Sequence, residues 1–196
     1  FEGRKDLFEG LAIAELEKDW AVHPVIHIDL NTGLYTSVEM LRQYLITQVS
    51  RLEEIFGRKD TEVLISDRFS GVIERAYEKT GRNVVVLIDE YDKPLLETIG
   101  KPELQEAFHD ELRSFYSVLK SYDKYIHFAM LTGVTKFGRL SVFSGLNNLY
   151  DLSFDPEYAS LCGITEQELT STCEEGIRVM AEVCECTFDE MVDKLR

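Results

Sequence analysis

Hydrophobic residues recur with two different periods in the first half of the chain, and each period predicts a different element. The run His23–Leu30 is short and apolar with polar interruptions, which predicts a strand. Apolar residues then recur every three or four positions, which predicts two helices closed by Gly57 and Gly81. The predicted buried positions are Val38, Leu41, Leu45, Val49, Leu52 and Phe56 in the first helix, and Ile65, Phe69, Val72, Ile73 and Ala76 in the second.

A second set of elements follows Gly81. The run Val84–Ile88 contains five consecutive aliphatic residues and predicts a strand that is covered on both faces. After Pro94, helical spacing predicts a helix from about Pro102 to Tyr122, and Tyr125–Thr132 predicts a strand. The stripe of that helix consists of Leu104, Phe108, Leu112, Phe115 and Leu119. Strands that alternate with helices predict an α/β fold, with a parallel sheet flanked by helices on both faces.

The C-terminal part of the chain has a different pattern. Thr165-x-x-Glu168 and Thr187-x-x-Glu190 both have the form of a capping box, so each predicts the start of a helix. Tyr150–Phe154 predicts one more strand before them. The predicted organisation is therefore a core over residues 1–160 and a helical, lid-like segment over 161–196.

Charge and composition narrow the class of protein. The chain has 21 basic and 36 acidic residues, a net charge of −15, so this segment by itself is expected to repel nucleic acid. No apolar run approaches the ~20 residues that span a bilayer, and the N-terminus lacks the pattern of a signal peptide. The four cysteines lie at Cys162, Cys173, Cys184 and Cys186, and they predict buried thiols in a reducing compartment, hence a cytoplasmic location.

Candidate chemistry follows the strand at 84–88. An apolar strand that ends in Asp89-Glu90 has the form of a Walker B segment, in which a rigid buried strand places carboxylates at the crevice beyond the strand ends. Asp89 is the candidate for the Mg²⁺ side of such a site, and Glu90 is the candidate for orienting and deprotonating water. The spacing alone leaves a second interpretation open, in which the two acids only begin a solvated loop or cap a helix.

Thr132 ends the next strand and is the candidate for contacting a γ-phosphate or the attacking water. A second interpretation is that its hydroxyl only satisfies a nearby backbone group. The phosphate-loop pattern G-x-x-x-x-G-K-[ST] does not occur, and its nearest match, Gly133–Leu140, has Arg139 in place of Lys and Leu140 in place of the hydroxyl residue. Lys136 and Arg139 are weak candidates for approaching phosphate, and a solvated loop explains them as well. The four histidines have no partners at ligand spacing.

The chain resembles the AAA-ATPase-like family of bacterial proteins, a P-loop NTPase group. The stretches that carry the resemblance are Val84–Leu95, Phe1–Ile13, Arg75–Gly81, Phe128–Phe143 and Ser144–Ile164. It implies a P-loop NTPase-like core that is incomplete at the N-terminus, because a Gly-Lys-Ser loop precedes the segment corresponding to Phe1 in that family. It also implies Mg²⁺ and ATP as cofactors, Asp89, Glu90 and Thr132 in the roles given above, and a nuclease-like domain towards the C-terminus of the full-length protein.

Three functions remain in view at this point. The first is an ATP-binding and hydrolysing domain that is truncated before its phosphate-binding loop and inactive as a fragment. The second is a non-catalytic interaction module with a nucleotide-binding-like fold. The third is a metal-dependent hydrolase that uses Asp89, Glu90 and Asp92 directly.

Overall fold

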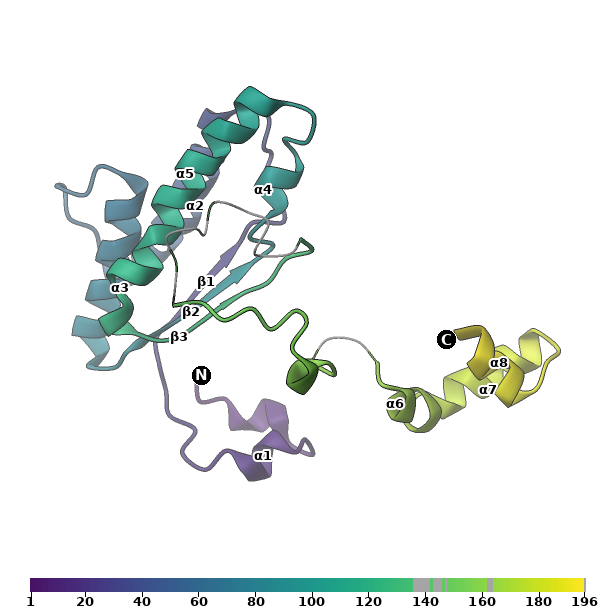
Figure 1. The fold of residues 1–196 in the computed structure, drawn as a ribbon. Helices are drawn as coiled ribbons and strands as arrows, with labels where there is room; N and C mark the ends of the chain where they lie inside the picture. The colour runs from purple at the N-terminus through teal and green to yellow at the C-terminus, as the bar shows by residue number, and fades with distance from the viewer. Residues whose placement is uncertain (136–141, 143–145, 147, 162–163, 196) are drawn as a thin grey trace. The chain divides into compact units, whose positions relative to one another are not determined.

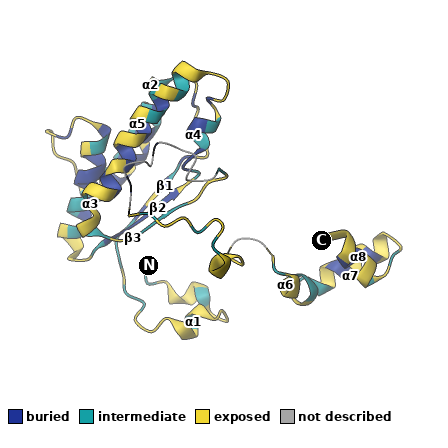
Figure 2. Ribbon diagram, viewed as in Figure 1, coloured by how far each residue is buried: buried dark blue, intermediate teal, exposed yellow. Residues whose placement is uncertain are grey.

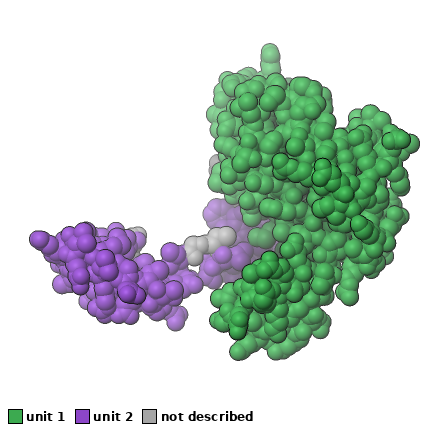
Figure 3. Space-filling view, turned by 180° about the vertical axis from the view of Figure 1, so that it is seen from behind, with its two compact units in different colours: residues 1–149 green, residues 150–196 purple. Residues whose placement is uncertain are grey.

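The computed structural model of the chain describes residues 1–135, 142, 146, 148–161 and 164–195 (Figure 1). These residues form two compact units, 1–149 and 150–196, which Figure 3 colours separately. The sequence predicts a domain boundary between residues 160 and 161. The division into compact units does not test that boundary, which stays a prediction.

Unit 1 is built on a parallel sheet of three strands, β1 (Val25–Asp29), β2 (Val84–Asp89) and β3 (Ile126–Leu131), in the order β1-β2-β3. β2 lies in the centre, and Val84, Val85 and Val86 are fully buried, as five consecutive aliphatic residues predict. β1 and β2 pair in a continuous register that ends with Asp29 opposite Asp89. β2 and β3 pair with one register shift between Val84 and Val85.

Three long helices cover one face of this sheet (Figure 1). They are α2 (Val38–Phe56), α3 (Ile65–Thr80) and α5 (Pro102–Ser121), and the short α4 (Lys93–Leu96) precedes α5. The expected closing glycines are confirmed, with φ of 86° at Gly57 and 66° at Gly81. Figure 2 shows the buried positions gathered where these helices meet the strands.

The predicted α/β fold with a parallel sheet flanked by helices is confirmed, and among the described residues the long helices all lie on one face of that sheet. Two right-handed crossovers that advance in the same direction, β1 to β2 and then β2 to β3, must place their helices on the same side. On the opposite face His27 is exposed, and Phe128 is 41% exposed. Val85 of the central strand, on the same face, is fully buried, so this open face is exposed only on its outer strands.

The N-terminal segment contacts part of the open face. It contains a 3-10 turn at Lys5–Phe8 and the one-turn helix α1 (Ile13–Leu16). The ring of Phe1 stacks on Phe128 with centroids 5.6 Å apart, and the rings of His23 and His127 stack at 4.2 Å. His127 is the residue at the register shift between β2 and β3, so the aromatic contacts lie at the irregular end of the sheet.

Unit 2 is helical, with α6 (Glu166–Ser171), α7 (Glu174–Val183) and α8 (Phe188–Leu195). Both predicted capping boxes are confirmed, because the Thr165 and Thr187 side chains accept from the backbones of Glu168 and Glu190, whose carboxylates accept in return. A small core lies between α7 and α8. Its fully enclosed members are Ile177, Ala181, Met191 and Val192.

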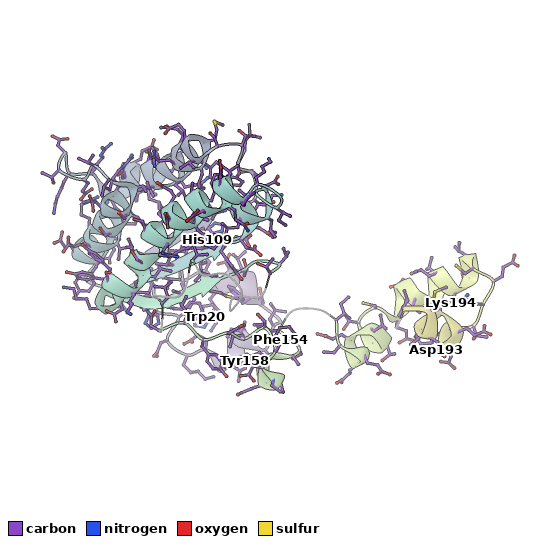
Figure 4. The ribbon with its side chains drawn as sticks, turned by 45° about the horizontal axis from the view of Figure 1, so that its top comes forward. Trp20, His109, Phe154, Tyr158, Asp193 and Lys194 are labelled. Carbon is purple, nitrogen blue, oxygen red and sulfur yellow. The ribbon has the colours of Figure 1, made fainter. Side chains whose placement is uncertain are left out.

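Two predictions for unit 2 are wrong. Tyr150–Phe154 is not a strand, because the Asp151 side chain accepts from the Ser153 amide at 3.0 Å and turns the chain. Phe154 and Tyr158 project from the coil and from the short 3-10 turn Pro156–Tyr158 that follows it (Figure 4). The thiols are not uniformly buried either, since Cys184 at the end of α7 is exposed; Cys162 lies outside the described residues.

None of the described helices combines the length and apolar character that crossing a bilayer requires.

Buried ion pairs tie the helical layer together. The Arg68 guanidinium of α3 donates to both oxygens of Glu53 on α2, at 2.8 and 2.6 Å, and the two side chains are 6% and 8% exposed. It also donates to Ser50 at 2.7 Å. Removing one member of such a pair leaves an uncompensated buried charge.

We expect Glu53→Ala to lower the free energy of unfolding of unit 1 by about 3–5 kcal/mol, because Arg68 loses its buried partner. Asp110→Ala is the matched control, since the ion pair of Asp110 with Arg113 is exposed and 3.9 Å long, and it should cause no measurable change. Urea denaturation followed by circular dichroism measures both variants. Equal effects of the two substitutions would contradict the role given to the buried pair.

Candidate functional site

The polar ends of all three strands meet at the carboxyl edge of the sheet. Asp29 and Asp89 are register partners, and Thr132 follows Leu131, which is the partner of Ile88. The ladder continues beyond the strands, because the Thr132 amide donates to the Ile88 carbonyl at 2.9 Å and the Tyr91 amide donates to the Thr132 carbonyl at 2.9 Å. Functional groups of open parallel sheets gather at this edge.

Asp89 and Thr132, which the sequence proposes as functional residues, are in direct contact. The Thr132 hydroxyl donates a hydrogen bond to Oδ1 of Asp89, and both residues are exposed. The Glu90 amide donates to the same oxygen at 3.1 Å. Among the described residues these two bonds both end on Oδ1 of Asp89.

Glu90 is in a left-handed backbone conformation, with φ of 54°. This region disfavours residues other than glycine and asparagine, and such a conformation persists only where neighbouring contacts hold it. The Glu90 carbonyl accepts a hydrogen bond from the Lys93 amide at 3.0 Å. The pKa of the Lys93 ammonium is raised, mainly because it donates a hydrogen bond to Glu97, and to a smaller extent because of the charge of Glu90. The Glu90 side chain is half-buried beside the exposed Asp89.

Asp92 is fully buried and binds the turn that follows β3. Its carboxylate accepts from the amide of Val134 at 3.1 Å, from the amide of Thr135 at 2.6 Å, and from the Thr135 hydroxyl. A Cβ on Gly133 would lie 2.5 Å from Oδ1 of Asp92, so only glycine fits where this turn approaches the carboxylate.

Tyr91 joins the same two segments from the other side. Its hydroxyl donates to the Thr135 carbonyl at 2.6 Å, and its own carbonyl accepts from the Tyr116 hydroxyl of α5 at 2.9 Å. Tyr116 is fully buried, and burial raises the pKa of its hydroxyl well above the ordinary value. We call the set Tyr91, Asp92, Gly133, Val134 and Thr135 the latch.

Sequence reasoning missed Asp29 and gave Asp92 a role only as a direct metal ligand. Asp29 lies opposite Asp89, its Oδ1 accepts from the Asn31 amide at 2.7 Å, and its carbonyl accepts from the Tyr44 hydroxyl at 2.8 Å. The signal was present in the sequence, because β1 and β2 both end in Ile-Asp. The order and register of the strands then decide whether these endings stand side by side, as they do here.

Some predicted features cannot be placed in this site. Lys136, Arg139 and the rest of the weak phosphate-loop match after Thr135 lie outside the described residues. Within the described ranges, no three or more His, Cys, Asp or Glu side chains gather as a metal cluster. Two hollows of about 480 and 210 Å³ lie on α5 and beside α2, and neither is lined by Asp89, Glu90 or Thr132.

Comparison with known proteins identifies the family of the chain. The AAA-ATPase-like family, whose description is "Predicted AAA-ATPase", matches residues 1–143. These residues include every strand of the sheet and the whole latch. The chain belongs to the AAA-ATPase-like family.

The AAA-ATPase-like chain also resembles a curated relative. It is 40% identical over 170 residues to an uncharacterized protein in the vnfD 5' region of Azotobacter chroococcum mcd 1. The alignment covers 86% of this chain and 33% of the relative, so the chain spans about a third of the length of that protein. No solved structure matches the AAA-ATPase-like chain.

The buried tyrosine beneath the site gives a prediction about pH. The unfolded chain ionises Tyr116 near pH 10, whereas the folded protein holds it neutral, so stability is complete below pH 10 and is lost as the pH rises above it. We expect the free energy of unfolding of Tyr116→Phe to fall less steeply between pH 10 and 11 than that of the wild type, by about 1 kcal/mol per pH unit. Urea midpoints at pH 9, 10 and 11 measure the slope, and parallel slopes would contradict the assignment.

Proposed function

We propose that this chain is the part of an ATP-binding and ATP-hydrolysing domain that supplies the metal-side acid, the water-activating acid and the γ-phosphate contact. The observation that carries the proposal is the junction of β2 and β3, where the Thr132 hydroxyl donates to Asp89 beside Glu90. Membership of the AAA-ATPase-like family supports it.

The residues at this edge fit Mg²⁺ and a nucleotide phosphate. Mg²⁺ keeps most of its waters and needs only one or two protein carboxylates, and Asp89 offers an exposed one on a rigid central strand. Asp29 adds a second carboxyl group at the neighbouring strand end. When bound, the ion would neutralise developing charge on the phosphate oxygens.

Each strand-end residue has a separate part in the proposed reaction. Asp89 holds the cation side of the site through Oδ2, while its Oδ1 accepts from Thr132. Glu90 accepts a proton from the attacking water and orients that water towards the γ-phosphate. Thr132 carries its hydroxyl at the end of the adjacent strand, where it can turn between Asp89 and a phosphate oxygen.

We further propose that another segment of the full-length polypeptide supplies the phosphate-binding loop. The pattern G-x-x-x-x-G-K-[ST] is absent from these 196 residues, and the aligned relative is much longer than this chain. Within the described part of the chain, no strand pairs with the outer edge of β3, which leaves room for one beside Thr132. The resemblance also implies a nuclease-like domain as the neighbour on which hydrolysis would act.

The two other functions have different support. A non-catalytic interaction module is favoured by the missing phosphate-loop pattern. A hydrolase that uses Asp92 as a direct metal ligand is disfavoured, because that carboxylate is fully buried and its oxygens accept from Val134 and Thr135. We therefore retain the interaction module as the alternative.

The test measures phosphate release from ATP by the chain joined to the segment encoded before Phe1. We expect Glu90→Gln to lower kcat by about 100-fold or more with little change in ATP binding, because it removes the group that takes the proton from water. Asp89→Asn should instead weaken Mg²⁺ binding, so that a higher Mg²⁺ concentration is needed for half-maximal activity.

Glu78→Gln is the matched control, since Glu78 is an exposed carboxylate near the end of α3, and its activity should equal that of the wild type. Hydrolysis that is indifferent to Glu90→Gln would refute the assigned role. Absence of both hydrolysis and an ATP-dependent thermal shift in the longer protein would favour the interaction module.

A further inference from the structure

We propose that Asp92 is a positioning residue that holds the Thr132 hydroxyl against Asp89 by anchoring the turn after β3. This inference rests on the function proposed above for Asp89 and Thr132. It assigns Asp92 a role that involves neither metal nor substrate.

The burial of Asp92 requires an explanation. A carboxylate that is 0% exposed is costly unless hydrogen bonds replace its lost water. Those bonds come from one short segment, namely the Val134 amide, the Thr135 amide and the Thr135 hydroxyl. One buried side chain from the turn after β2 therefore organises the backbone of the turn after β3.

The rest of the latch completes the connection. The amide of Tyr91 donates to the Thr132 carbonyl at 2.9 Å, and its hydroxyl donates to the Thr135 carbonyl at 2.6 Å. Thr132 and Thr135 are thus both bonded to the Tyr91–Asp92 pair. The segment between them cannot shift along the strand direction without breaking several of these bonds.

This anchoring matters because Thr132 itself is exposed. Packing does not confine its side chain, so the direction of its hydroxyl depends on the backbone that carries it. The Ile88 carbonyl holds the Thr132 amide, the latch holds the backbone that follows, and the hydroxyl then meets Asp89. The backbones that carry Asp89 and Thr132 consequently keep one spacing, which positional catalysis demands.

Gly133 shows how closely the two turns approach. A Cβ at this position would lie 2.5 Å from Oδ1 of Asp92 and 2.8 Å from the Tyr91 ring. Gly133→Ala should therefore push the turn away from Asp92. Gly176→Ala on α7 is the matched control, because a Cβ there meets nothing within 4 Å.

The first experiment needs no nucleotide. The ¹³C resonance of the Asp89 carboxyl group reports the hydrogen bond from Thr132, and Thr132→Val marks its position when that bond is absent. We expect Asp92→Ala and Gly133→Ala to move the resonance towards that position, and Gly176→Ala to leave it unchanged. We also expect amide exchange at Thr135 to accelerate by on the order of tenfold in Asp92→Ala.

Two milder variants apply if Asp92→Ala fails to fold. Thr135→Val removes only the hydroxyl donor and should shift the Asp89 resonance in the same direction, whereas Thr135→Ser keeps the donor and should restore the wild-type position. An Asp89 resonance that ignores Asp92→Ala, or Thr135→Val where that variant is used, overturns the proposal.

The second experiment separates positioning from mere stability. In the ATPase that carries its phosphate loop, Asp92→Asn should lower kcat about tenfold while KM for MgATP stays within about threefold. If Glu90→Gln is inactive but Asp92→Asn keeps full kcat, Asp92 is structural only and the proposal fails. If the wild type hydrolyses no ATP, the proposed function fails, and the Asp89 resonance still decides whether Asp92 positions Thr132.

Discussion

The parallel hydrogen bonds that β2 forms on both sides determine where every polar group of the site stands. Because β2 lies between β1 and β3, its end is in register with both, and Asp29, Asp89 and Thr132 reach the same edge. The burial of Val84–Val86 makes that strand rigid, since its side chains cannot move without opening the core. The carboxylates therefore inherit their positions from apolar residues several positions upstream.

The latch extends this order beyond the sheet. β3 ends at Leu131 and the ladder bonds continue only through Thr132, after which exposed turns would ordinarily be free to move. Here the two turns share one buried carboxylate, and the tyrosines at 91 and 116 connect them to α5. The left-handed conformation of Glu90 lies between these fixed points, so the surrounding contacts can sustain a backbone geometry that an isolated turn would avoid.

The one-sided helical layer has a consequence for the whole protein. Successive right-handed crossovers that advance in one direction do not cover the second face, which the N-terminal segment contacts through the stacked ring pairs Phe1–Phe128 and His23–His127. Phe128 remains 41% exposed on a strand whose outer edge has no partner among the described residues. The exposed Phe128 and the free outer edge both belong to β3, the strand beside which the proposal places the phosphate-binding segment.

The sequence by itself determined the three strands of the sheet and the long helices, and it singled out Asp89, Glu90 and Thr132 as candidate site residues. Apolar periodicity is a local property, and so are capping boxes and the glycines at 57 and 81, which is why these elements and their ends are confirmed. The tertiary structure alone decided which face the helices cover, that Asp29 stands opposite Asp89, and that Asp92 is buried. Each of these depends on strand order or on contacts between residues about forty or more positions apart, and the spacing of residues along the chain carries no information about either.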